Sequence, residues 1–394
     1  MKLNKEFFFN WLLIMVGVSL PFPDYSLVSK FIIGLSIFWL FFYNPLEEKK
    51  RIIKSNLSRF LTISSLYLLL LIGTIYTSER INIISELILK LPFVILPLII
   101  FSVSIKKELF WLIYKYFSYA VLVTSMSALL KAIFFRYYGL GNYFYYHEFS
   151  IFLNKHSTYY ALFLVLSIIY FAVHWIDDNK NTSKIIHTCI YILFLLYMLY
   201  VISNRISFIA LSIGILILAF WKLRTKTKLV YTVLVIGFTV FMFNTSHLKN
   251  RFFPSYLQAQ KLNEFELRKA HWKSVIETIR HNNIFFGTGT EGNRDYLYDR
   301  YKKNNYKIAY IHKYNAHNQF LEFTLDYGLF GSLIFLFFLF YIFFIFIKNK
   351  DKLAITILIV FLIFMMTESI LERQSGIIIF TLFISLLMNR RKEK

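Results

Sequence analysis

Residues 317–335, HNQFLEFTLDYGLFGSLIF, decide how the fold of this chain is interpreted. His317 and Asn318 stand directly before an apolar run that continues to residue 347. Such a run is long enough to cross the roughly 30 Å of hydrocarbon in a bilayer. The stretch therefore predicts a membrane helix with a titratable side chain at its beginning.

The composition extends this interpretation to the whole chain. Its 394 residues are 57% hydrophobic and 20% aromatic, which excludes an ordinary soluble domain and is typical of a polytopic membrane protein. The net charge of +22 does not indicate nucleic-acid binding, because the basic residues lie mostly in short loops between apolar runs. The single cysteine, Cys189, excludes an internal disulfide.

Hydropathy predicts about twelve transmembrane helices, and we expect an all-α polytopic membrane protein. The predicted spans are 7–22, 27–43, 58–77, 83–103, 109–135, 157–175, 185–202, 206–221, 229–245, 318–347, 353–367 and 374–389. Loops rich in lysine and arginine alternate with loops that have few, so the positive-inside rule predicts that both termini are cytoplasmic. This topology predicts that the chain has three parts. They are transmembrane helices 1–9 in residues 1–245, a long periplasmic loop in 246–316, and transmembrane helices 10–12 with a cytoplasmic tail in 317–394.

The long loop contains two recognisable segments. NEFELRKAHWKSVIETIR, residues 263–280, has apolar residues at helical spacing among charges and predicts an amphipathic helix. FFGTGTEGNRD, residues 285–295, predicts a glycine-rich turn.

Polar residues gather on the outer side in this topology. They are Asn154, His156, Ser203, Asn204, Arg205, Arg268, His271, His317, Glu368, Glu372 and Arg373. Every even-numbered span also begins there, and a helix N-terminus attracts anions through its unpaired N–H groups. Together with Arg205 and Arg268, these helix ends indicate a site for a phosphate or pyrophosphate.

Each of these residues also has a purely structural interpretation. Arg205 can extend to lipid headgroups, and His317 can be an interfacial histidine with a satisfied ring. Gly328 and Gly331 most simply allow close helix packing. Glu86 and Lys90, four residues apart in the fourth span, can shield each other as an ion pair.

The sequence gives little support to metal or nucleotide chemistry. Asp177 and Asp178 fall in an inner loop, and Asp295 and Asp299 lack histidine or cysteine at ligand spacing. No P-loop or dinucleotide-binding fingerprint is present. We therefore expect no metal ion and no cofactor.

Several motifs resemble the O-antigen ligase and O-antigen polymerase superfamily of bacterial inner-membrane glycan transferases. The resemblance rests on HNQFLEFTLDYGLFG, with support from ELRKAHW, FFGTGTEGN, SNRISFIALSIGIL and NKHSTYYALFL. It covers about residues 155–375, and the first 150 residues match only in hydropathy.

The resemblance implies a periplasmic cavity closed by the long loop, and an inverting, metal-independent transfer of a glycan from undecaprenyl pyrophosphate. His317 would act as the general base, because a histidine can take the proton of an attacking sugar hydroxyl. Arg205 and Arg268 would stabilise the departing pyrophosphate. The supporting residues would be His156, Asn318, Glu368 and Arg373, with Glu368 or Glu372 orienting the histidine or holding sugar hydroxyls.

The acceptor stays open at this point. Ligase-type transfer to lipid A core is the leading hypothesis, and a polymerase or a protein O-oligosaccharyltransferase would use the same base and cations. A transporter or flippase for lipid-linked sugars is an alternative from another class, but it predicts mid-membrane polar residues and two related halves. A structural membrane scaffold would explain the helices but not the one-sided polar cluster.

Overall fold

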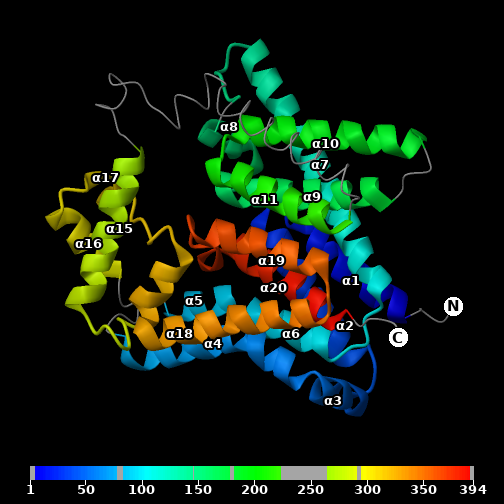
Figure 1. The fold of residues 1–394 in the computed structure, drawn as a ribbon, viewed down its shortest axis with the longest axis horizontal. Coiled ribbons are helices and arrows are strands. Elements are labelled where there is room, and N and C mark those ends of the chain that lie inside the picture. Colours follow the sequence, from blue (N-terminus) through cyan, green and yellow to red (C-terminus); the bar gives the residue numbers. More distant parts are fainter. Residues whose placement is uncertain are drawn as a thin grey trace.

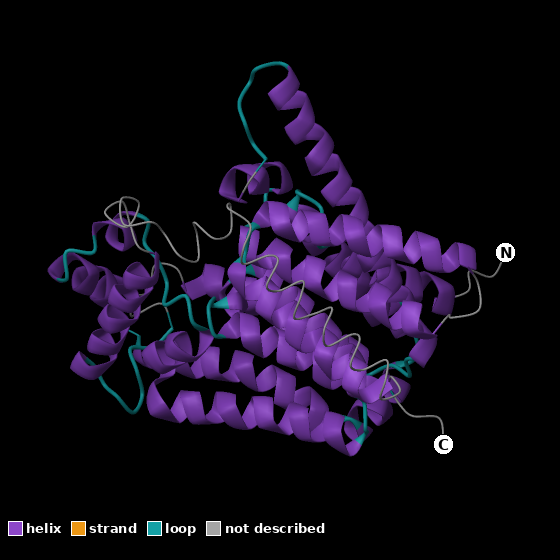
Figure 2. Ribbon diagram, turned by 45° about the horizontal axis from the view of Figure 1, so that its top comes forward, coloured by secondary structure: helices purple, strands orange, loops and turns teal. Residues whose placement is uncertain are grey.

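The structure is a computed structural model. It describes residues 5–77, 83–144, 146–177, 182–222, 264–290 and 294–390. All regular secondary structure in these residues is helical, with no strand among them (Figure 2). The expected all-α class is therefore confirmed.

The main bundle consists of apolar helices of different lengths. They are α1 (Lys5–Ser19), α2 (Tyr25–Phe41), α4 (Leu57–Tyr76), α5 (Ile83–Lys90), α6 (Pro92–Phe101), α7 (Lys107–Tyr137), α9 (Ser157–Asp177), α10 (Thr182–Ile202), α11 (Arg205–Lys222), α18 (Gln319–Lys348), α19 (Lys352–Met365) and α20 (Gln374–Asn389). The other helices are α3 (Leu46–Ser55), α8 (Tyr146–Leu153), α15 (Glu264–His281), α16 (Arg294–Lys303), α17 (Lys307–Ile311) and the 3-10 helix η1 (Ile370–Glu372).

Six helical segments of the described chain are long and apolar enough to cross a membrane, or seven if the bent pair α2 and α3 counts as one span. Three further apolar helices, α11, α19 and α20, are shorter. The predicted span 229–245 lies outside the described residues. The structure thus agrees with an α-helical membrane protein, while the expected number of twelve spans stays a prediction.

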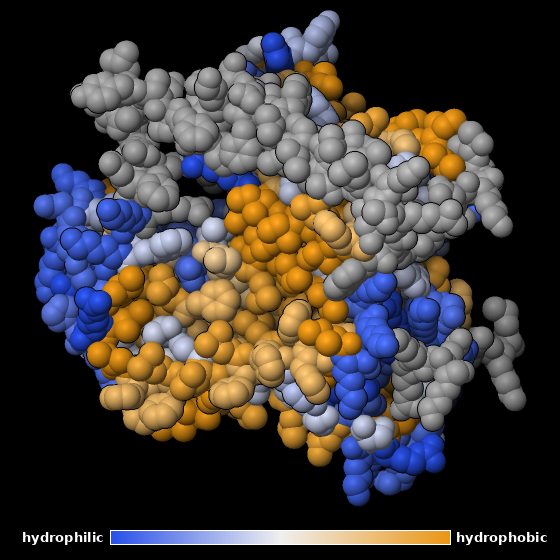
Figure 3. Space-filling view, viewed as in Figure 1, coloured by the Kyte–Doolittle hydropathy of each residue, from blue (hydrophilic) through white to orange (hydrophobic). Residues whose placement is uncertain are grey.

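The centre of the bundle is formed by helices that are apolar on every side, because only such helices can be buried all round. In α20, every residue from Ser375 to Asn389 is buried, and α9 is almost as completely enclosed. By contrast, α18 and α4 leave large apolar side chains exposed, such as Phe337 at 69%. Figure 3 shows an apolar surface along this part of the molecule, between hydrophilic regions at its two ends.

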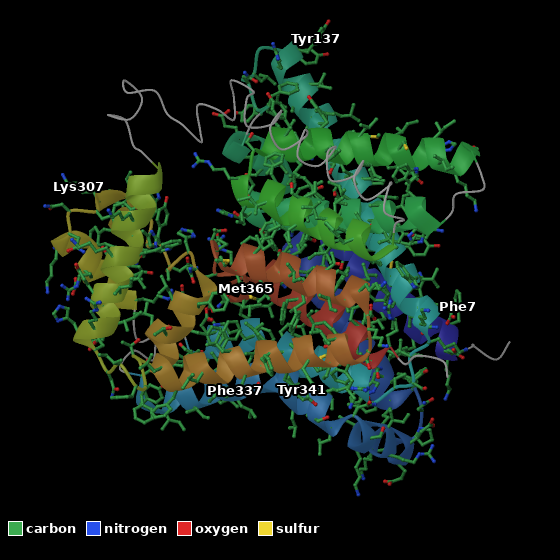
Figure 4. The ribbon with its side chains drawn as sticks, viewed as in Figure 1. Phe7, Tyr137, Lys307, Phe337, Tyr341 and Met365 are labelled. Atoms are coloured by element: carbon green, nitrogen blue, oxygen red, sulfur yellow. The ribbon has the colours of Figure 1, made fainter. Side chains whose placement is uncertain are left out.

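The two ends of the bundle differ. Helices α15, α16 and α17 form a small cluster at the end where α18 begins, whereas α1 begins and α20 finishes at the other end (Figure 1). Lys307 on α17 and Phe7 on α1 accordingly lie far apart (Figure 4). Helix α15 confirms the amphipathic helix expected in the long loop, and Val275 on it is fully buried.

Gly328 interrupts α18, and its role differs from the close helix packing expected of it. Its φ of 63° and ψ of −163° are not helical, and only glycine adopts such angles readily. The glycine-rich segment 284–290 fills the break: the N–H groups of Leu329 and Phe330 donate to the carbonyls of Ile284 and Phe285 at 2.8 and 3.2 Å. The broken helix therefore fixes the long loop to the bundle through backbone hydrogen bonds, which a membrane-embedded break requires.

Candidate active site

His317 lies in the short segment that leads from the α15–α17 cluster into α18. Its backbone has a φ of 44°, in the left-handed region that non-glycine residues seldom adopt. Its N–H donates to Oδ1 of Asn315 at 3.1 Å. Such conformations persist only where the surroundings hold them, and they are frequent at functional sites.

Asn318, expected to support the site, begins α18 as its N-cap. Its Oδ1 accepts the N–H groups of Phe320 and Leu321 at 3.0 and 3.1 Å. Its Nδ2 donates to the carbonyl of Met366 at 3.0 Å. The residue therefore ties the start of α18 to the segment between α19 and α20, where Glu368 is found.

His317 and Glu368 form a direct pair. The Nδ1 atom of His317 lies 2.9 Å from Oε1 of Glu368, and their side chains are 26% and 6% exposed. Burial alone would raise the pKa of Glu368, but the charge of His317 and its hydrogen bond, with smaller effects from His156 and Arg373, lower that pKa to about 2. Glu368 is thus ionised near neutral pH.

The ionised Glu368 decides which ring nitrogen of His317 is free to act. A carboxylate accepts hydrogen bonds and cannot donate them, so Nδ1 of His317 carries the proton in this pair. In the neutral ring, Nε2 then has the lone pair and can accept a proton. This arrangement suits a general base.

His156 and Arg373 approach the same carboxylate from two further segments. His156 directly precedes α9, and Arg373 directly precedes α20. Both are close enough to Glu368 for their charges to lower its pKa. The structure thus brings four of the predicted residues together: His156, His317, Glu368 and Arg373.

Arg205 is the first residue of α11, whose N-terminus lies beside that of α9. Asn204 caps α11 by accepting the N–H of Ser207 at 3.3 Å, and its Nδ2 donates to Oγ1 of Thr158 at 3.1 Å. The positive ends of two helices and one guanidinium therefore share one region, which suits an anion. Arg268 belongs to α15, but its side chain lies outside the described residues.

His271 is a neighbour of His317 whose role sequence patterns did not reveal. The two ring centroids are 5.2 Å apart. The Nε2 atom of His271 lies 2.6 Å from the carbonyl oxygen of Asn315 and 2.9 Å from the hydroxyl of Tyr301. Because it contacts the residue whose side chain holds the His317 backbone, His271 connects α15 to the candidate base.

A buried group of charges lies next to these residues, and two of its members, Arg294 and Glu322, were not singled out from the sequence. Nη1 of Arg294 lies 2.7 Å from Oε1 of Glu322, whose side chain is fully buried. The predicted pair of Glu86 and Lys90 is confirmed at 3.5 Å, but Lys90 lies closer to Glu372, at 2.6 Å. A carboxylate inside an apolar span, as at Glu322, is a signal that marks this group in the sequence.

Within the described residues, no group of three or more histidine, cysteine, aspartate or glutamate side chains is placed to hold a metal ion. The carboxylates near His317 are instead paired with cationic side chains, as in the pairs formed by Glu322 and Glu372. The arrangement offers a base and several fixed charges.

Comparison with known proteins finds one family model that matches part of the chain. Residues 190–336 match the family model described as O-antigen ligase. No curated protein matches the chain. The matched region runs from α10 into α18 and contains Arg205, Arg268 and His317, whereas His156 and Glu368 lie outside it.

Proposed function

We propose that this chain, which carries an O-antigen ligase domain in residues 190–336, transfers a glycan from undecaprenyl pyrophosphate to an acceptor hydroxyl. The family match supports a glycosyltransferase-like membrane enzyme that acts on lipid-linked glycans. The donor lipid, the acceptor and the stereochemistry are the proposal's own additions. No cofactor takes part in this reaction.

One observation carries the proposal: the pairing of His317 with the ionised Glu368. The acceptor oxygen attacks the anomeric carbon, and its proton passes to Nε2 of His317. The new glycosidic bond forms as the bond from that carbon to the pyrophosphate oxygen breaks, with inversion. Glu368 orients the ring and stabilises the imidazolium that forms, as the acid of a catalytic triad does for its histidine.

The leaving pyrophosphate gains negative charge, which fixed cations and dipoles can stabilise without a metal ion. Arg205 at the beginning of α11, the adjacent beginning of α9 and Arg373 supply these groups. We assign the same role to Arg268 on α15. His156 is proposed to contact either the acceptor or a phosphate.

The proposed setting is the periplasmic face of the bacterial inner membrane, with both termini cytoplasmic and residues 246–316 as the periplasmic part. The opposite positions of α15–α17 and the described chain ends support this orientation (Figure 1). Lipid A core is the proposed acceptor. A growing lipid-linked glycan or a protein hydroxyl would require the same base, so the product must be identified directly.

Replacement of His317 tests the proposal. Wild type, His317→Ala and the control His281→Ala, whose side chain is exposed at the end of α15, are purified in detergent. Each is incubated with undecaprenyl-pyrophosphate glycan and lipid A core in the presence of EDTA. We expect glycan linked to core from wild type and control, and at least about 10²-fold less from His317→Ala. Gels and mass spectrometry identify the products.

Each other outcome has a defined meaning. Longer lipid-linked chains from wild type would indicate a polymerase instead of a ligase. Equal product from wild type and His317→Ala would remove His317 as the base. Activity that EDTA abolishes and divalent metal restores would contradict the metal-independent mechanism.

A further inference from the structure

Glu322 is a fully buried carboxylate one turn into α18, and neither of its oxygens faces solvent. Oε1 accepts a hydrogen bond from Nη1 of Arg294 at 2.7 Å. Oε2 accepts the backbone N–H of Ala316 at 2.7 Å and the hydroxyl of Ser369 at 2.9 Å. A buried carboxylate is tolerated because these three donors compensate for its desolvation.

The three donors belong to three separate segments of the chain. Arg294 begins α16, Ala316 directly precedes His317, and Ser369 directly follows Glu368. Glu322 therefore joins the segment that carries the candidate base to the segment that carries its partner. It also fixes both of them to the α15–α17 cluster.

Both connected segments need such support. His317 has an unfavourable positive φ, and this strained backbone relaxes if its neighbours release it. Ser369 also accepts the N–H of Asn318 at 3.3 Å, so the same hydroxyl contacts the residue on the other side of His317. Loss of the carboxylate would free the chain on both sides of the base.

We infer that Glu322 is a positioning residue of the proposed transfer: it holds His317 against Glu368 through Ala316 and Ser369. This inference rests on the proposed function. Glu322 does not contact the reacting atoms in this role. It acts on the rate through geometry, because a displacement of about 1 Å in a catalytic group can cost on the order of 10²-fold.

The replacement Glu322→Gln tests this role with little change in size. Glutamine has one acceptor oxygen, so its NH₂ group must face one of the three donors. We expect kcat to fall about 10²-fold, while KM for the lipid-linked donor changes less than about threefold. In a Glu368→Gln background the same replacement should cost less than about threefold, since the pair that it positions is already lost.

Ser369→Ala is the milder variant. It tests the positioning role of Glu322 if the Glu322→Gln protein does not fold. It removes one donor and leaves the contact with Arg294 in place. We expect kcat to fall roughly tenfold, again with little further loss in the Glu368→Gln background. The matched control is Asp351→Asn, because Asp351 caps α19 and pairs with Arg390 near the described C-terminal end. Its kcat should stay within about threefold of wild type.

The outcomes separate this inference from the proposed function. Wild type and His317→Ala are measured in the same assay, and equal rates for these two would overturn both. A clear difference between them, combined with equal fold-losses in the wild-type and Glu368→Gln backgrounds, would overturn the positioning role alone. A higher KM with an unchanged kcat in Glu322→Gln would also overturn the positioning role alone.

Discussion

At the scale of single residues, the ionised state of Glu368 is the property that the candidate site depends on. Its carboxylate is almost entirely buried, yet it stays charged because cationic groups surround it. A protonated Glu368 would no longer require the proton of His317 to sit on Nδ1. The ring could then change tautomer and lose the lone pair on Nε2.

Glu368→Gln should therefore slow the transfer. We expect a loss on the order of 10²-fold in kcat, because an amide can face the ring with either its oxygen or its NH₂ group. The measurement is the rate of glycan transfer by the purified variant, with Glu277→Gln on α15 as the control. A wild-type rate in Glu368→Gln would contradict the proposed orientation of His317.

The difference in stability between wild type and Glu368→Gln should also depend on pH. The pKa of Glu368 is lowered from 4.5 to about 2 in the folded protein, so its charge stabilises the fold fully above pH 4.5. That contribution is lost as the pH falls from 4.5 towards 2. We expect the difference in Tm between wild type and Glu368→Gln in detergent to shrink as the pH falls over that interval. A constant difference would contradict the lowered pKa of Glu368 in the folded protein.

At the scale of elements, the break in α18 connects the membrane bundle to the long loop. Segment 284–290 pairs with the backbone on both sides of Gly328, and Gly289 donates its N–H to the carbonyl of Asp326 at 2.9 Å. The paired residues Asp326, Leu329 and Phe330 lie seven to eleven positions after Gln319, the first residue of α18. His317 lies directly before the N-cap of the same helix. The glycines therefore serve the docking of the loop.

Gly328→Ala should destabilise the protein strongly. A Cβ atom at this position would overlap the backbone of Phe285, and the φ of 63° is itself unfavourable for alanine. We expect a loss of folded, detergent-extracted protein and a Tm lowered by several degrees. Gly34→Ala on α2 is the control, because a Cβ atom added there would lie 3.9 Å from its nearest neighbour, Cδ2 of Leu12. Equal Tm values for the two variants would contradict the docking role.

At the scale of the whole molecule, the two ends of the bundle are predicted to face different compartments. Lys307 on α17 and Lys50 on α3 are both exposed, and their helices lie at different ends (Figures 1 and 4). In a Cys189→Ser background, a membrane-impermeant maleimide should label Lys307→Cys in spheroplasts. It should label Lys50→Cys only after the membrane is disrupted, and the reverse pattern would contradict the proposed topology.

The sequence predicted the elements better than their contacts. The apolar runs that begin near residues 157, 318 and 374 correspond closely to α9, α18 and α20. Hydropathy is a local property that a short window contains, so each such helix is visible before any packing is known. Hydropathy does not define the number of spans in the same way, because α11, α19 and α20 are shorter than the other apolar helices.

The sequence also pointed to His317, because a histidine directly before an apolar run is a local signal. It could not indicate which of Glu368 and Glu372 would contact the ring. The structure pairs Glu368 with His317, whereas Glu372 contacts Lys90 on α5. Which carboxylate faces which cation depends on how the segment after α19 folds over the beginning of α18.

What the sequence determined by itself was the set of apolar helices, their charged ends and a histidine at one of those ends. The contacts of that histidine depend on how the helices pack together. His317 and Glu368 are 51 residues apart, and Arg294 and Glu322 are 28 apart. Such pairs form because packing of the helices removes these charges from water. Inside the protein, each buried charge then needs a partner of opposite sign. That requirement depends on burial, which a single sequence does not contain.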